Sequence, residues 1–119
     1  MKALVSASLA LAAVIASAPA IAQPVNEPAP GYSSLMSANY GQAEREIRAA
    51  NVSPYDPARA INLGIALAKT GRADAAMAQF RGVLAEQDVE MVVADGQTVM
   101  SHDVARRALA ALQSGALSR

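Results

Sequence analysis

The sequence predicts a mainly α-helical fold, in which an antiparallel helical hairpin is followed by a short C-terminal β-hairpin and a capping helix. Three observations lead to this prediction. Apolar residues recur at three- and four-residue steps over much of residues 39–84, which is the pattern of one buried helix face. Asp56 followed by Pro57 is a typical helix start. Asp95 followed by Gly96 stands between two β-forming runs and indicates a hairpin turn.

Residues 1–22 are predicted to be a cleaved signal peptide. A lysine near the start is followed by an apolar run over residues 3–15, and Ala22 completes the small-x-small pattern that a signal peptidase recognises. Cleavage there leaves Gln23 as the first residue of the mature chain. The alternative is a membrane anchor, but two prolines interrupt the apolar stretch before it reaches the ~20 residues that span a bilayer. We therefore expect a periplasmic or secreted protein without stable membrane insertion.

Residues 23–38 are predicted to be a flexible, proline-rich linker that precedes the folded region. The stretch 23–34 contains three prolines and a glycine but only one bulky aliphatic residue, Val25. Such a composition provides little apolar surface for packing and favours a partly extended tether. The helical region is expected to follow at residues 39–88, and a β-hairpin with a final helix at residues 89–119.

The first helix is expected to begin near Asn39. Asn39 and Gln42 have the spacing of a capping box, in which two side chains satisfy backbone N–H groups at the helix start. The apolar stripe that follows consists of Tyr40, Ala43, Ile47 and Ala50. Pro54 disfavours a helical conformation at Ser53, so the helix is expected to end before that point.

The second helix is expected to run from Pro57 to Lys69 and to be surrounded by other parts of the chain. It is apolar on nearly all sides, which is typical of a helix packed between neighbours. Gly64 in its middle costs about 1 kcal/mol of helix stability relative to Ala, so we expect another helix to approach closely there. Gly71 is expected to end the helix in a left-handed conformation.

The third helix is expected to start at Arg72 or Ala73, with Asp74 in its first turn, where the helix dipole favours an acidic side chain. Its apolar stripe consists of Ala76, Met77, Phe80, Val83 and Leu84. A stripe of this kind is far more often part of a core than of a cofactor site. The second and third helices are therefore predicted to pack as an antiparallel pair.

The pattern changes after residue 88. Val89, Met91 and Val93 stand at alternate positions, as in a half-buried strand, and β-forming residues resume after the turn. Ser101 is then a candidate N-cap for a fourth helix. The apolar stripe of this helix consists of Val104, Ala108, Leu109 and Leu112. Because that stripe needs a surface to cover, we expect the helix to cap the preceding pair.

Composition argues against several classes of function. Ten basic and ten acidic residues give a formal net charge of zero, and removal of residues 1–22 takes away one lysine and leaves −1. A nucleic-acid partner bound by phosphate neutralisation is therefore not expected. The chain has no cysteine, which excludes disulfides, thiol nucleophiles and cysteine-ligated zinc. With His102 as the single histidine, a zinc site would consist almost wholly of carboxylates, so no metal or cofactor is expected.

Part of the helical region has a characteristic spacing, formed by Asn62, Leu63, Gly64, Leu67, Gly71, Arg72, Ala76, Phe80 and Leu84. This spacing resembles a tetratricopeptide repeat, a helix–turn–helix unit of ~34 residues. One unit covers residues 57–90, and residues 40–54 resemble the second helix of a preceding unit, which makes about one and a half repeats. The chain departs from the family pattern at Ala60, where a large aromatic residue is usual, and at Asp88, near which a closing proline is expected.

The resemblance implies a protein–protein interaction module that binds another protein or a peptide. Repeats of this family line a concave groove mainly with the first helix of each unit, and the corresponding residues here are Ala58, Ile61, Asn62, Ile65 and Lys69. Asn62 and Lys69 are expected to hydrogen-bond a peptide backbone or a carboxylate, and Ile61 and Ile65 to receive apolar side chains. The alternative, that the C-terminal hairpin covers this face itself, stays open.

No catalytic residue is predicted. Ser101, His102 and Asp103 are the residue types of a hydrolase triad, but adjacent side chains point in different directions, whereas the members of a triad converge in space. A capped helix start explains these three residues better. A small hydrolase that uses His102 is therefore kept only as a less favoured alternative to the interaction module.

The small number of repeats leaves one further hypothesis. Repeat arrays usually need three or more units, because each unit buries its apolar face on its neighbour. Either the hairpin and the final helix supply the missing cap, or a second copy supplies it. In the second case the protein is a self-associating structural component of the cell envelope. We favour a cap within the chain and keep a homo-oligomer as the alternative.

Overall fold

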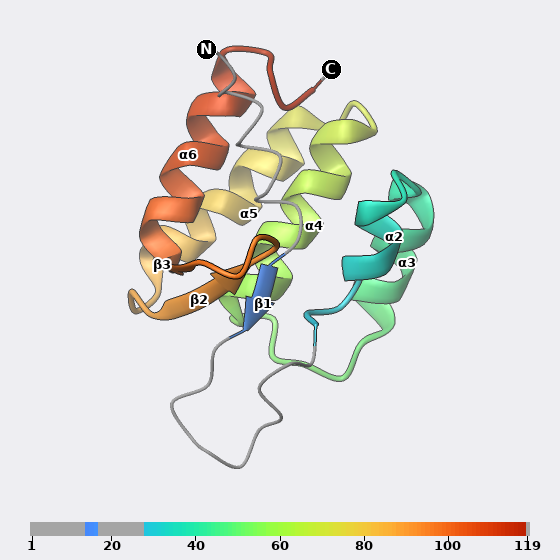
Figure 1. Ribbon diagram of the computed structural model, residues 1–119. Coiled ribbons are helices and arrows are strands. Elements are labelled where there is room, and N and C mark those ends of the chain that lie inside the picture. Colours follow the sequence, from blue (N-terminus) through green and yellow to red (C-terminus); the bar gives the residue numbers. More distant parts are fainter. Residues whose placement is uncertain (1–13, 17–27, 119) are drawn as a thin grey trace.

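The structure is a computed structural model, which describes residues 14–16 and 28–118. Within these residues the elements are β1 (Val14–Ala16), α2 (Tyr32–Met36), α3 (Tyr40–Ala49), α4 (Pro57–Lys69), α5 (Ala73–Ala85), β2 (Glu90–Val93), β3 (Thr98–Met100) and α6 (Ser101–Gln113) (Figure 1). The prediction of a mainly α-helical fold with a short β-hairpin is confirmed. The predicted cleavage site between Ala22 and Gln23 lies outside the described residues, as does most of the predicted signal peptide.

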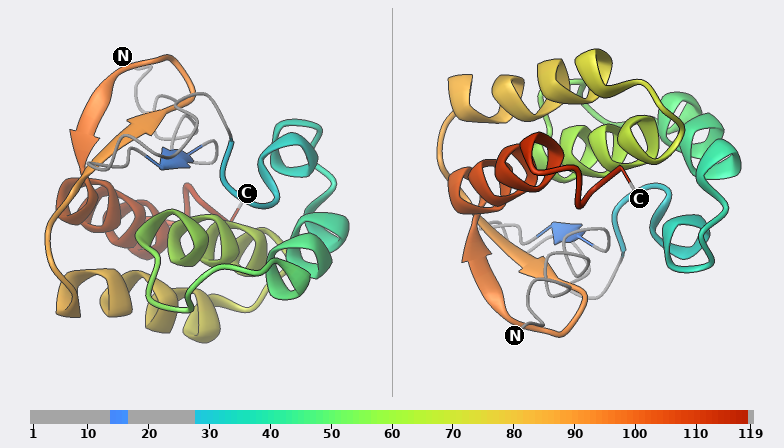
Figure 2. Two further views of the ribbon diagram at one scale, coloured as in Figure 1. Left: turned by 90° about the horizontal axis from the view of Figure 1, so that it is seen from below. Right: turned by 90° about the horizontal axis from the view of Figure 1, so that it is seen from above.

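The elements form three layers (Figure 2). α5 forms one outer layer, α4 and α6 lie side by side in the middle, and the small sheet lies with α2 on the other side. α3 packs beside α4, at the end of the middle layer that is remote from α6. The middle layer therefore has neighbours on both faces, and the core lies around α4.

α4 is the central element, and its ends follow the signals in the sequence. The Asp56 carboxylate accepts a hydrogen bond from the backbone N–H of Arg59 at 2.9 Å, and Pro57 occupies the first turn. Gly71 follows the C-terminus with a φ of +83°. Ten of the 13 residues of α4 are buried. The prediction of a helix surrounded by neighbours is therefore confirmed.

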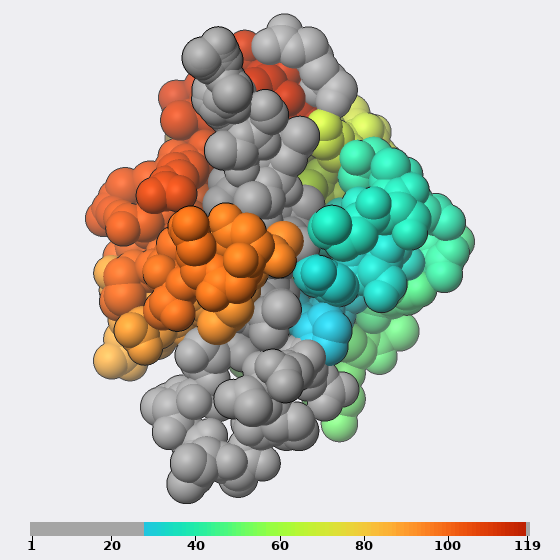
Figure 3. All heavy atoms as spheres, viewed as in Figure 1, coloured from blue at the N-terminus to red at the C-terminus, as the bar shows by residue number. Residues whose placement is uncertain are grey.

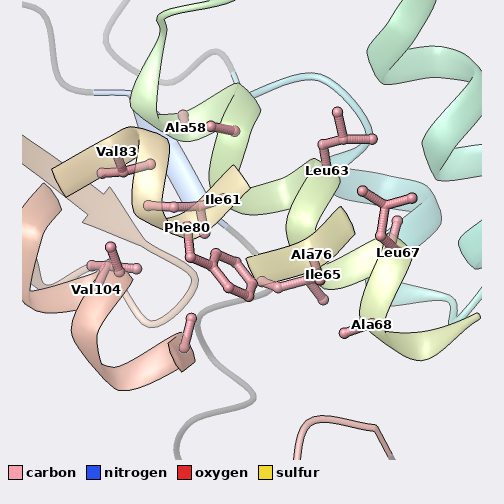
Figure 4. Packing of buried hydrophobic residues seen from close by; sticks show 14 of the residues in the cluster. Ala58, Ile61, Leu63, Ile65, Leu67, Ala68, Ala76, Phe80, Val83 and Val104 are labelled. Carbon is pink, nitrogen blue, oxygen red and sulfur yellow. The ribbon is translucent and has the colours of Figure 1, made fainter. Parts of the chain in front are cut away.

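α4 and α5 approach each other closely at Gly64, where Phe80 of α5 lies against α4 (Figure 4). A Cβ atom added to Gly64 would lie 2.8 Å from Cζ of Phe80, which is closer than side-chain carbons pack. Phe80 is fully buried, and so is Ala76 one turn earlier on α5. The predicted close approach of a second helix at Gly64 is thus confirmed, and it explains why a residue that weakens the helix stands in its middle.

The predicted linker, residues 23–38, contains a helix. α2 lies within it, and Leu35 of α2 is buried together with the preceding Ala29. Gly31 has a φ of +79°, and a Cβ atom there would lie 2.7 Å from Cγ1 of Ile47, so the chain enters α2 in close contact with α3. The prolines indicated a tether, whereas the packing depends on contacts with α3 that local composition does not reveal.

The three strands form an antiparallel sheet in the order β1-β2-β3. The predicted hairpin corresponds to β2 and β3. In its turn, the Asp95 carboxylate accepts a hydrogen bond from the backbone N–H of Gln97 at 2.9 Å, and Gly96 has a φ of +88°. β1 differs from the prediction, because it lies in the stretch interpreted as a signal peptide and pairs with the outer edge of β2.

α6 returns from the hairpin and packs against α5 and α4. Its buried apolar residues are Val104, Ala105, Ala108, Ala111 and Leu112. Because α6 and α5 lie on adjacent sides of α4, the apolar surface of the helical pair is closed within the chain (Figure 2). The predicted capping helix is confirmed.

Candidate functional site

The five residues predicted to line a binding groove all belong to α4, and the structure places four of them in the interior. Exposure is at most 1% for Ala58, Ile61, Asn62 and Ile65, whereas Lys69 is half-buried at the C-terminal end of the helix. Figure 4 shows Ile61 and Ile65 pointing toward Phe80 of α5. The face of α4 that carries these residues is therefore covered within the chain.

Besides α5, segments that precede α4 cover this face. Nδ2 of Asn62 donates a hydrogen bond to the backbone carbonyl of Pro30 at 3.3 Å. β1 and α6 also contact α4 (Figure 1). One of the two open alternatives placed the C-terminal hairpin over this face, whereas the structure places β1 and the segment before α2 there. In the space-filling view the hairpin (orange) lies on the left and the α2–α3 pair (cyan to green) on the right (Figure 3).

Asn62 is the one polar residue among the four buried positions of the predicted groove, and its side chain is fully buried. Its Oδ1 atom accepts no hydrogen bond within the described part of the chain. A buried amide oxygen without a partner costs about 1–3 kcal/mol, because it has lost its hydrogen bonds to water. Asn62 therefore weakens the fold where it stands, and its oxygen is a free acceptor for a backbone N–H that reaches this face.

The residues considered for a hydrolase do not form a triad. Ser101 is fully buried, and its Oγ accepts from the backbone N–H of Val89 at 2.9 Å and donates to the Asp88 carboxylate at 3.3 Å. Nε2 of His102 donates to the backbone carbonyl of Glu86 at 2.8 Å. Asp103 pairs with Arg106 at 3.0 Å. No hydrogen bond joins the Ser101 hydroxyl to the His102 ring among these contacts, so the arrangement is that of a helix start.

Asp88 is the acceptor that holds the start of α6. One of its carboxylate oxygens accepts a hydrogen bond from the backbone N–H of His102 at 2.9 Å, and the other lies 4.0 Å from Nδ1 of the same residue. The backbone N–H of His102 is the main reason that the pKa of Asp88 is lowered, followed by the charge of the His102 ring. The prediction of Ser101 as the N-cap is wrong, because Ser101 is the first residue of α6 and Met100 is the N-cap. The capping carboxylate comes instead from Asp88 in the loop before β2.

A second polar cluster joins α3 to the turn between α4 and α5. Glu44 accepts two hydrogen bonds from Arg72, at 2.6 and 3.1 Å, and one from Arg48 at 2.9 Å. These hydrogen bonds, with that from Arg72 the largest cause, lower the pKa of Glu44 below its ordinary value of 4.5. The Glu44–Arg48 pair joins residues four apart, on successive turns of α3, whereas the longer-range bond to Arg72 depends on the tertiary fold.

A surface pocket of about 240 Å³ lies outside the predicted groove, beside α5. Residues that line it include Pro54, Tyr55, Ala78, Gln79, Gly82 and Glu86. Tyr55 is 69% exposed, and a Cβ atom added to Gly82 meets no atom within 4 Å. Sequence reasoning missed this pocket. The small residues on α5 were the available signal, but they indicate a hollow only once the exposed face of α5 is known.

Neither a membrane-spanning helix nor a metal-binding cluster is found among the described residues. None of the helices among residues 28–118 is long and apolar enough to cross a membrane. In that same part of the chain, no group of three or more histidine or acidic side chains is placed to hold a metal ion.

Comparison with known proteins does not place the chain in a family. No family model matches it, and neither a curated protein nor a solved structure shows significant similarity to it.

Proposed function

We propose that this protein is a non-catalytic, exported interaction module of tetratricopeptide type. It binds another protein or peptide through the Asn62 side of α4, once the segments that cover this side, β1 and the stretch before α2, have been displaced. The support is the spacing of the two helices of the repeat-like unit, together with the contact between Gly64 and Phe80. α3 and α6 flank this unit, as helices of neighbouring units would.

The proposal depends on one observation, which is that the side chain of Asn62 is fully buried while its Oδ1 atom accepts no hydrogen bond within the described residues. A fully buried position on a central helix is ordinarily filled by an apolar residue, since an unpaired amide oxygen lowers stability. Here the amide already donates to one backbone carbonyl, that of Pro30, and keeps an unused acceptor. Residues that break the rules of core packing are commonly found at functional sites. A peptide backbone offers the N–H group that Oδ1 lacks.

The test of this proposal is Asn62→Leu, which removes the amide and keeps a side chain branched at Cγ. We expect a free energy of unfolding close to that of the unaltered chain, because the loss of the hydrogen bond to the Pro30 carbonyl opposes the removal of the unpaired oxygen. We also expect a loss of partner crosslinking in the cell envelope of at least about tenfold. Gln79→Leu on α5 is the control, because it makes the same kind of change away from the α4 face. A folded Asn62→Leu chain that crosslinks as strongly as the control would refute the proposal.

Export is the part of the proposal that rests on residues 1–22. The chain recovered from the periplasm of an expressing bacterium is expected to begin at Gln23, and Ala22→Phe is expected to leave the leader attached. Intact-mass measurement distinguishes the two forms. A chain that stays in the cytoplasm, or that carries Met1 in the periplasm, contradicts this part without bearing on Asn62.

A further inference from the structure

The outer edge of β2 is occupied by a strand from the predicted leader. β1 pairs antiparallel with β2, with Val14 opposite Val93, Ile15 opposite Val92 and Ala16 opposite Met91. β1 also contacts α4, so it lies between the edge of the hairpin and the central helix. This strand belongs to the predicted signal peptide, which is removed on export, whereas the β2 edge on which it lies belongs to the part of the chain that remains.

The directions of the backbone N–H and C=O groups show which residue of β2 would lack hydrogen-bond partners if β1 were removed. The backbone N–H of Val93 donates to the carbonyl of Gln97 at 3.0 Å, so the N–H and C=O groups of Val93 face β3. Successive residues of a strand direct these groups to opposite edges. The N–H and C=O groups of Val92 therefore face β1, where Ile15 is the opposite residue. Without β1, this edge carries unpaired hydrogen-bonding groups.

The edge of β2 on which β1 lies is held in place by contacts that do not involve β1. β2 is paired with β3 on its other side, with Met91 opposite Val99 and Val92 opposite Thr98. The backbone carbonyl of Val89 accepts from the N–H of Ser101 at 2.7 Å, and the N–H of Val89 donates to the Ser101 hydroxyl at 2.9 Å. These bonds tie the start of β2 to α6. An exposed strand edge that is held in place is a template for an added strand.

We propose that β2 is a strand-acceptor site: once residues 1–22 are removed, its outer edge binds an extended apolar segment of a partner protein, antiparallel and in the place of β1. The sequence Val-Ile-Ala that occupies the site defines the partner's chemistry, which is a short run of β-branched and small apolar residues. In the unprocessed chain the leader fills the site. This inference rests on the export step of the proposed function and adds the partner's chemistry to it.

The experiment measures binding of a labelled peptide with the sequence of residues 12–18, Ala-Ala-Val-Ile-Ala-Ser-Ala, up to millimolar concentration. It compares the processed chain with the full-length Ala22→Phe precursor. The processed chain is expected to bind the peptide at least about tenfold more tightly, because the attached leader competes at a high effective concentration. Equal binding by both forms, or none by the processed chain, overturns the proposal.

Two modified peptides make the test specific for strand pairing. N-methylation of the amide at the Ile15 position removes the N–H group that faces Val92, and is expected to weaken binding about tenfold. N-methylation at the Ala16 position is the matched control, because that amide faces away from β2 and its loss leaves pairing intact. Equal effects of the two modifications would show that the peptide binds by apolar contact alone, which overturns the strand-acceptor site.

The remaining outcomes separate this inference from the proposed function. If the processed chain is a dimer that the peptide fails to dissociate, a second copy occupies the edge and the proposal is overturned. If the peptide fails to bind while Asn62-dependent crosslinking persists, only the strand-acceptor site is lost. If the peptide binds while Asn62→Leu crosslinks normally, only the proposed role of the α4 face is lost.

Discussion

Gly64 has no side chain because Phe80 fills the space beside it. Gly64→Ala would favour the helix by about 1 kcal/mol, but the added carbon must displace a fully buried ring. Overpacking of this kind typically costs about 1–3 kcal/mol. We expect the clash to prevail, so that urea denaturation gives a lower free energy of unfolding for this variant.

Gly82 on α5 provides the matched control for Gly64. It is exposed, and a Cβ atom there meets no atom within 4 Å. Gly82→Ala is therefore expected to raise the free energy of unfolding by about 0.5–1 kcal/mol through helix propensity alone. If both substitutions changed the free energy of unfolding in the same direction, the close contact between Gly64 and Phe80 would be contradicted.

At the scale of elements, Glu44 links α3 to the turn that joins α4 and α5. Its pKa is lowered in the folded chain by hydrogen bonds from Arg72 and Arg48. A lowered pKa means that stabilisation is present above the ordinary value of 4.5 and is lost as the pH falls through the folded value. Glu44→Gln is expected to cost about 1 kcal/mol or less near pH 7 and to cost progressively less below pH 4.5.

The measurement for Glu44 is the free energy of unfolding of both chains as a function of pH. A double-mutant cycle with Arg72→Gln supplies the control, since Glu44→Gln should matter less once the arginine is absent. A difference between the two chains that stays constant from pH 7 to pH 3 would rule out the pair as its source.

The start of α6 depends on a carboxylate from outside the helix. Asp88→Ala removes the acceptor for the backbone N–H of His102 and for the Ser101 hydroxyl, so thermal unfolding is expected at a lower temperature. Asp88→Asn keeps an oxygen that can accept both bonds and should recover much of the loss. Equal melting temperatures for Asp88→Ala and Asp88→Asn would show that capping by Asp88 does not contribute to stability.

At the scale of the whole molecule, the β2 edge predicts a linkage between peptide binding and stability. The peptide of residues 12–18 should raise the free energy of unfolding of the processed chain by about 1.4 kcal/mol at ten times its dissociation constant. The Ala22→Phe precursor should show little change, since β1 already fills the site. Thermal unfolding at several peptide concentrations measures both effects, and an equal rise in the two forms contradicts the linkage.

The parts of the fold that follow local rules could be predicted from the sequence. Asp56 and Pro57 begin α4, Gly71 ends it, and Asp95 with Gly96 makes the hairpin turn, because each acts through its own backbone conformation or that of its neighbours. The close approach of a second helix at Gly64 could also be predicted. Glycine destabilises the middle of a helix, so it is expected there only where a neighbouring element leaves no room for a side chain.

The parts that depend on distant contacts were not predictable in the same way. α2 is held by α3, β1 pairs with a strand that lies far along the chain, and Asp88 caps a helix from the preceding loop. For the α4 face, residue spacing indicated which side chains share a side, but it left open what covers them. The unpaired oxygen of Asn62 became visible only when its surroundings were known.

The turn between β2 and β3 is a suitable place to attach a label to this protein. Asp95 and Gly96 are both exposed, and their conformation is held by bonds within the turn, from Gln97 to the Asp95 carboxylate and from Gly96 to the carbonyl of Val93. Exposed loop tips are the places that best tolerate added sequence. A fluorophore attached here would sit beyond the helical layers and next to the Val93 end of the β2 edge, where it would report on the pairing of a strand with that edge.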